Sequence, residues 1–157
     1  MRKTMTKPLL LLAAACWLLT CSLSGAAQDK GYWRASGSTA AAITGDIAIT
    51  ETKLTISFSP FTIAQIRRVD AAEILAVFDL ENTNGGTGNL YRLNIPASRH
   101  FLHHNSLCGS DDAQWMVTYA VDRNLQVAFF SGSNLPVLTR DALANSTDLC
   151  GTFSYIH

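Results

Sequence analysis

Hydrophobic and polar residues alternate in two neighbouring runs near the end of the chain. Apolar side chains occupy every second position from Trp115 to Val121 and again from Leu125 to Phe129. A short polar segment, Asp122–Asn124, separates the two runs. A period of two is typical of a half-buried strand, and a short polar segment is typical of a turn. The pattern therefore predicts a β-hairpin in this part of the chain.

Similar alternation predicts strands elsewhere in the chain. The further expected strands cover residues 43–49, 54–58, 61–69, 73–80, 91–95 and 152–155. Segment 73–80 is apolar on both faces, which fits a strand buried on both sides or a short helix, and its Val, Ile and Phe content favours the strand. Residues 28–42 are small and polar, so we expect a loose start that becomes ordered near Trp33. Thr139 is expected to cap a single helical turn that ends near Asn145.

Together these elements describe an all-β fold. Seven to eight short strands separated by turn signals, without a helix of crossover length, favour antiparallel pairing. We therefore predict a small antiparallel barrel or sandwich. The barrel is preferred because closure removes exposed strand edges.

The first 27 residues have the pattern of a cleaved export signal. Arg2, Lys3 and Lys7 flank the start of an apolar run, Leu9–Leu19, and small residues follow up to Ala27. The run is too short to span a bilayer comfortably, and the order of basic, apolar and small residues is typical of a signal peptide. The sequence thus predicts a signal peptide over residues 1–27 and a single β-domain over residues 28–157, exported to the periplasm or the cell exterior.

A lipid anchor is the alternative to a free exported domain. Cys21 or Cys16 would carry the lipid, but Thr20 is larger than the residue usually found before a lipidated cysteine, and the apolar stretch before Cys16 is short. No later stretch is apolar for long enough to form a transmembrane helix. We therefore expect no membrane-spanning segment in the mature chain.

The charge balance argues against a nucleic-acid partner. Three of the 12 Lys and Arg residues lie in the first 27 positions, whereas all 12 Asp and Glu residues lie beyond them. The rest of the chain therefore has nine basic and twelve acidic residues, a net charge of −3. A nucleic-acid-binding surface needs clustered basic residues. Adjacent basic residues occur there only at Arg67 and Arg68.

Two cysteines, Cys108 and Cys150, lie beyond the signal peptide. An exported chain enters an oxidising compartment, where two remaining cysteines most simply pair with each other. The predicted disulfide closes a long loop, and loop-closure entropy gives it a contribution of roughly 4 kcal/mol.

Most candidate site residues lie in residues 96–112, the longest irregular segment. The predicted binding residues are Arg99, His100, His103, His104, Asp111, Asp112 and Trp115. The segment is interpreted as a contact surface for an envelope protein, with residues 131–138 beside it. The alternatives are zinc or copper ligation by the histidines with an aspartate, and a metal-dependent hydrolase built from the same groups. Because a fixed third and fourth ligand and a nucleophile motif are both missing, we predict no metal, cofactor or catalytic residue.

Aromatic residues on the predicted strands allow a different function. Trp115, Tyr119, Phe129 and Phe153 would either fill the core or line the cavity of a lipocalin-like carrier of a small apolar ligand. In size and architecture the chain resembles small periplasmic proteins such as the inhibitors of c-type lysozyme, a resemblance that assigns no functional residue. The sequence therefore favours a non-catalytic binding or protein-interaction module of the cell envelope.

Overall fold

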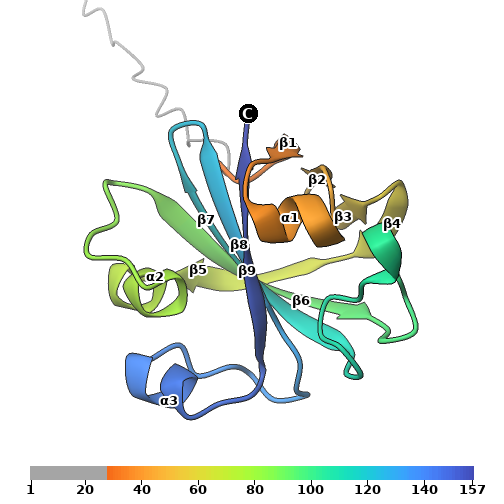
Figure 1. Ribbon diagram of the computed structural model, residues 1–157. Coiled ribbons are helices and arrows are strands. Elements are labelled where there is room, and N and C mark those ends of the chain that lie inside the picture. Colours follow the sequence, from red (N-terminus) through yellow and green to blue (C-terminus); the bar gives the residue numbers. More distant parts are fainter. Residues whose placement is uncertain (1–27) are drawn as a thin grey trace, which may run out of the picture.

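The structure is a computed structural model that describes residues 28–157, and the predicted signal peptide and its two cysteines lie outside these residues. Within them, nine strands form one antiparallel sheet in the order β4-β3-β2-β1-β9-β8-β7-β6-β5 (Figure 1). In chain order the strands are β1 (Gly31–Ala35), β2 (Ile47–Ile49), β3 (Lys53–Ile56), β4 (Ser59–Thr62), β5 (Ala64–Val69), β6 (Thr87–Ile95), β7 (Ala113–Val121), β8 (Asn124–Phe130) and β9 (Leu149–Ile156). The all-β class and the antiparallel pairing are confirmed.

The sheet is not closed into a barrel, which corrects the preferred form of the prediction. Its edge strands β4 and β5 follow each other in the chain, separated only by Ile63. Strand β4 pairs with β3 and β5 pairs with β6, so the chain passes from one edge of the sheet to the other at this residue. The strand expected over residues 61–69 is therefore two strands, because the pairing partner changes at Ile63.

The prediction of a strand over residues 73–80 is wrong. It forms helix α2 (Ala71–Phe78), which begins with a capping box between Asp70 and Glu73. Each of these two side chains accepts a hydrogen bond from the other residue's backbone N–H, at 2.9 Å. The Asp-x-x-Glu spacing is a recognised helix start, and it outweighs the β-branched composition that favoured a strand.

The other helices are short. Helix α1 (Ser38–Ile43) and β1 occupy the segment expected to be loose, and Gly45 then reverses the chain with a φ of +62°. The strand expected from residue 43 therefore begins only at residue 47. Helix α3 (Arg140–Ala144) confirms the predicted helical turn, and its Thr139 cap accepts from the backbone N–H of Ala142.

Two hydrophobic cores lie on opposite faces of the sheet. The inner core collects side chains from β1, β2, β3, β6, β7, β8 and β9, so the sheet curves around it. The outer core lies between β6, β7 and β8 and the helix α2, with Leu138 and Leu143 from the α3 region. Figure 1 shows α2 and α3 together on the left of β9 and α1 on its right. The middle strands therefore have both faces covered.

The predicted hairpin and disulfide are both confirmed. Strands β7 and β8 pair in register from Trp115 opposite Phe130 to Val121 opposite Asn124. Cys108 and Cys150 form a disulfide that ties the segment before β7 to the start of β9. This link joins the irregular segment 96–112 to the last strand of the sheet.

Replacing Cys108 with Ser should lower the free energy of unfolding by about 2–4 kcal/mol, because the unfolded chain regains the freedom that the loop closure removes. Urea denaturation measures this loss, and Cys150 should then react with a thiol reagent. Reduced wild-type protein is the matched control and should unfold at a similar urea concentration. Two reactive thiols in the oxidised wild-type protein would contradict the prediction.

The contribution of the α2 capping region to the free energy of unfolding should decrease at acidic pH. The hydrogen bonds from Arg67 to Glu73 hold the pKa of the Glu73 carboxyl below its ordinary value. A lowered pKa stabilises the fold above the ordinary carboxyl pKa, and this contribution disappears as the pH falls through the lowered value. Urea midpoints of Glu73→Gln should therefore fall less between pH 5 and pH 3 than those of wild type, whereas Glu81→Gln should follow wild type.

Candidate functional site

An apolar groove of about 410 Å³ lies on the outer side of β2 and β3. Its lining residues are Tyr32, Thr44, Gly45, Asp46, Ile47, Ala48, Thr55, Ser57, Phe58 and Leu102. Six large hydrophobic side chains are exposed in the described residues, and three of them, Tyr32, Phe58 and Leu102, belong to this groove. Exposed apolar side chains that gather in one place mark interaction sites more often than scattered ones do. This concentration makes the groove the leading candidate site.

Phe58 stands at the tip of the β3–β4 hairpin and is 100% exposed. It forms a two-residue turn with Ser57, and both residues have positive φ angles, of 47° and 65°. Such turns normally use Asn-Gly or Gly-containing pairs, since a side chain in the left-handed region costs about 1–2 kcal/mol. Ser57 is held in place because its hydroxyl donates to the carbonyl of Thr44 at 3.0 Å. The turn thus holds a whole aromatic side chain in water at a conformational cost.

The strand predicted over residues 54–58 would include Phe58. The strand ends two residues earlier, at Ile56, and the next strand starts at Ser59. Pro60 is tolerated inside β4 because β4 is an edge strand, where a missing N–H leaves no ladder bond unmade. Pro60 therefore lies within the second strand of a hairpin.

The opposite wall of the groove comes from the 3₁₀ turn η1 (Leu102–His104). The Asn105 side-chain amide donates to the carbonyl of Ala42 at 3.1 Å, which fixes this turn against α1. A Cβ at Gly45 would approach Leu102 to 3.1 Å, so the glycine permits the close packing of the turn. His103 and His104 are exposed and have φ angles of 54° and 59°. Strained backbone therefore flanks the groove on two sides.

Asp46 and Tyr32 line a third side of the groove. One carboxylate oxygen accepts from the Tyr32 hydroxyl at 2.5 Å, and the other accepts from the backbone N–H of Ala35 at 2.9 Å. These two bonds, the tyrosine bond first, lower the pKa of Asp46, and the same contact raises the pKa of Tyr32. Asp46 stays ionised and Tyr32 stays protonated near neutral pH. Their pairing keeps the exposed tyrosine ring at the edge of the groove.

The structure places the predicted binding residues in several parts of the molecule. Arg99 lies over the ring of Phe61, at 6.0 Å from its centroid, and donates to the Ser59 hydroxyl beside the Phe58 turn. His100, like His103 and His104, is exposed. Asp111 and Asp112 lie at a different, polar groove, which residues 131–133 also line. Trp115 is 8% exposed and belongs to the outer core.

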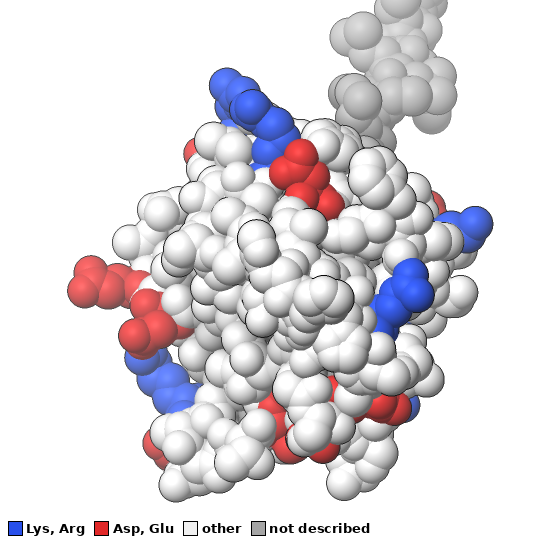
Figure 2. All heavy atoms as spheres, turned by 45° about the vertical axis from the view of Figure 1, so that its right-hand side comes forward, with Lys and Arg blue, Asp and Glu red and all other residues white. Residues whose placement is uncertain are grey.

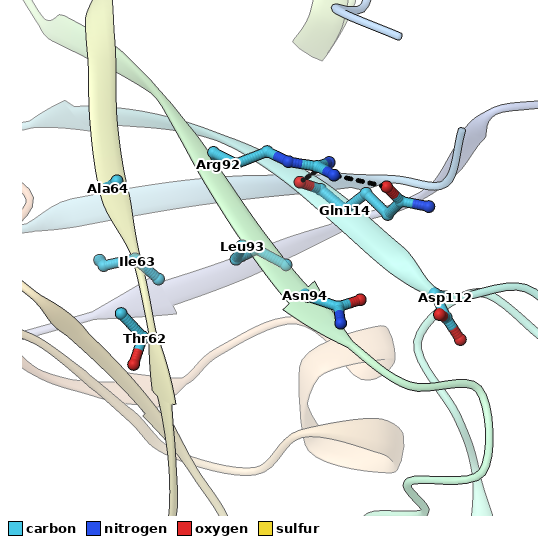
Figure 3. Close-up of a pocket in the computed structure, with 8 residues that line it drawn as sticks. All are labelled: Thr62, Ile63, Ala64, Arg92, Leu93, Asn94, Asp112 and Gln114. Carbon is cyan, nitrogen blue, oxygen red and sulfur yellow. Dashed lines mark hydrogen bonds between the residues drawn. The ribbon is translucent and has the colours of Figure 1, made fainter. Parts of the chain in front are cut away.

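A second open groove, of about 510 Å³, lies where β4 passes into β5. Figure 3 shows Arg92 extending toward Gln114, with Asp112 further along the wall. The guanidinium donates to the backbone carbonyl of Gln114 at 2.8 Å and to its side-chain oxygen at 2.6 Å. It also covers the ring of Trp115, 4.6 Å from the centroid. Arg92 therefore already has protein partners on two sides, which makes this groove a weaker candidate.

The arrangement of the side chains gives little support to a metal site or to a ligand carrier. Within residues 28–157, no three His, Cys, Asp or Glu side chains are close enough to hold a metal ion. The four aromatic residues proposed for a ligand cavity lie on two faces of the sheet. Trp115 and Tyr119 belong to the outer core, whereas Phe129 and Phe153 pack edge to face in the inner core. They do not line one cavity.

Asp29 is a polar residue that the sequence reasoning missed. Its side chain is 1% exposed, and one carboxylate oxygen accepts from Asn89, Tyr91 and Thr118 at 2.6–2.9 Å. These partners point inward from β6 and β7. Lys30 donates to the Tyr91 hydroxyl at 2.7 Å. The burial and the neighbouring carboxylate raise the pKa of Tyr91 far above its ordinary value, so the phenol remains a donor. No sequence signal marks the network, because Asp29 is separated from its partners on β6 and β7 by 60 or more residues along the chain.

Replacing Tyr91 with Phe should destabilise the protein by about 1–3 kcal/mol, because a buried carboxylate loses one of its donors. Tyr32→Phe is the matched control, since it also removes one hydroxyl bonded to an aspartate, but at an exposed position. Urea denaturation of the two variants should show the larger loss for Tyr91→Phe. Equal losses would mean that burial adds nothing to the Asp29 network.

None of the helices in residues 28–157 is long and apolar enough to cross a membrane. No family model, no curated protein and no solved structure matches this chain.

Proposed function

We propose that the protein is exported and acts as a non-catalytic binding module of the cell envelope, which captures a partner protein through the groove between Tyr32, Phe58 and Leu102. The observation that carries this proposal is the fully exposed Phe58, held by a strained turn beside an apolar groove. The export rests on the signal-peptide pattern, and the disulfide is in keeping with an oxidising compartment.

The energetics favour a binding role for Phe58 over a structural one. Within the fold the side chain buries no surface, and its backbone conformation costs free energy. On burial in a complex, a phenylalanine side chain contributes about 1.5–3 kcal/mol. Aromatic anchors of this kind, surrounded by weaker contacts, dominate many protein interfaces. Phe58 therefore offers a partner binding energy that the isolated domain does not use.

The shape and charge of the surface point to a protein rather than a small polar substrate. A groove of about 410 Å³ accommodates one or two side chains of a partner. Figure 2 shows the side of the molecule that carries β2, β3 and β4, where charged side chains lie around the rim and the centre is free of them. An uncharged centre with a polar rim is the usual anatomy of a protein interface.

The titratable residues of the groove are unsuited to acid–base catalysis. Tyr32 and Asp46 are its titratable lining residues, and they are bonded to each other. The pKa of Asp46 is lowered and that of Tyr32 is raised, so both move away from neutral pH. A general acid or base works best with a pKa near the operating pH. The groove therefore supports binding and not proton transfer.

Phe58→Gly should weaken partner binding about 10- to 100-fold, the equivalent of losing one buried aromatic anchor. The same change should raise the melting temperature, because glycine adopts a positive φ without strain. The wild-type domain would be used to isolate partners from an envelope extract, and the affinity of each purified partner would then be measured for both proteins. Opposite changes in stability and affinity distinguish a binding residue from a structural one.

Ile66→Ala is the matched control for this experiment. Ile66 is an exposed apolar residue, 49% accessible, on the edge strand β5 and outside the groove. Its replacement should leave the affinity unchanged, whereas Leu102→Asp should weaken binding by introducing a charge at the wall of the groove. A partner that binds Phe58→Gly and Leu102→Asp as tightly as wild type would refute the assignment of this surface.

A further inference from the structure

The carboxylate of Asp29 is satisfied on one side only. Its Oδ2 accepts three hydrogen bonds, but its Oδ1 has no hydrogen-bond partner among the described residues. The nearest cation, Lys30, lies 3.8 Å from Oδ1, beyond hydrogen-bonding distance, and donates instead to the Tyr91 hydroxyl. A buried carboxylate oxygen without a donor is costly. The site therefore calls for one more donor, and a cationic donor would suit it best.

The groups that pack around Asp29 do not supply this donor. Asn89 and Tyr91 of β6 and Thr118 of β7 all bond to the other oxygen. Two further ionisable groups lie nearby. Glu51 acts on Tyr91 through its negative charge, and the His157 ring stacks on Trp33, whose indole N–H donates to the Asp29 carbonyl. None of the described residues donates to Oδ1, and the chain just before Asp29 is the adjacent source of a further donor.

We propose that removal of the signal peptide supplies this partner, as an α-ammonium group that pairs with Asp29. The inference rests on the export in the proposed function. Signal peptidase adds water across the peptide bond between Ala27 and Gln28, the C–N bond breaks, and the released amine of Gln28 takes up a proton near neutral pH. The new terminus lies one residue from Asp29 in the chain. An uncharged amide becomes a cation next to a buried anion.

This arrangement couples processing to stability. The unprocessed chain has a neutral amide nitrogen at Gln28, whereas the processed chain has a charge that opposes that of Asp29. An opposite charge stabilises a buried carboxylate that is otherwise only partly paired. The mature domain is therefore more stable than the same domain with its leader attached. Cleavage of the leader becomes the last step that fixes Asp29, just before β1, to its partners on β6 and β7.

The test compares termini on otherwise identical protein. The full chain is expressed with its leader, and the terminus of the exported product is established by mass spectrometry. One sample keeps the free amine. In a second, glutaminyl cyclase closes Gln28 to pyroglutamate, in which the α-amine attacks its own side-chain amide, ammonia leaves, and the charge is lost. In a third, glycine and serine inserted between Ala27 and Gln28 move the amine away from Asp29.

We expect the cyclised and extended proteins to melt about 3–8 °C below the free-amine protein at pH 7. Pairing raises the pKa of the amine, so the advantage should be complete below its ordinary value and vanish as the pH rises through the raised value. In an Asp29→Asn background the three termini should melt together. If that variant does not fold, the pH dependence of the difference between termini decides the matter by itself.

Equal melting temperatures for the three wild-type termini would overturn the proposal, and would leave a buried water as the partner of Oδ1. A leader that remains attached, or is cut elsewhere, would overturn it too. These outcomes are independent of the groove, because partner binding is measured on Phe58 variants with an unchanged terminus. Loss of the proposed function and loss of this inference are therefore distinguishable.

Discussion

The burial of both faces of the β7–β8 hairpin is the constraint on which the structure depends. An antiparallel pair that is apolar on both faces needs a cover on each face, and different parts of the chain cover the two faces. The sheet curves so that its N-terminal strands cover the inner face, while α2, Leu138 and Leu143 cover the outer face. The disulfide between Cys108 and Cys150 then joins the segment that enters the hairpin to the strand β9 beside it. Closure into a barrel is unnecessary, because the chain itself links the two edges at Ile63.

On the surface, several residues with strained backbone conformations lie around one groove. Ser57, Phe58, His103 and His104 have positive φ angles and lie in two turns on two sides of a single groove. The first turn is bonded to the α1 region through Ser57 and the second through Asn105. A domain that must only be stable gains nothing from such a turn with an exposed aromatic tip. The proposed binding role gives a physical reason for it, since a partner would recover by burial what the turn costs in the free domain.

The Asp29 network shows the opposite arrangement, in which a charge lies at the end of an apolar interior. Three donors from β6 and β7 hold one carboxylate oxygen, and the arrangement fixes where the N-terminal strand enters the sheet. A network of this kind is costly when incomplete, because the interior cannot hydrate the unmet group. This sensitivity is the physical basis of the proposed pairing between Asp29 and the terminus that cleavage of the leader would create.

Local signals in the sequence determined the β7–β8 hairpin, the α3 cap at Thr139 and the pairing of two cysteines, because each depends on neighbouring residues or on a simple count. The strand predicted over residues 73–80 was wrong, because the Asp70–Glu73 capping box starts a helix there and outweighs the β-branched composition. The exposure of Phe58, the division of the aromatic residues between two cores and the Asp29 network were decided only by the tertiary structure. They depend on which strands pair across long separations, and alternation along one strand shows that two faces exist without showing what covers each of them.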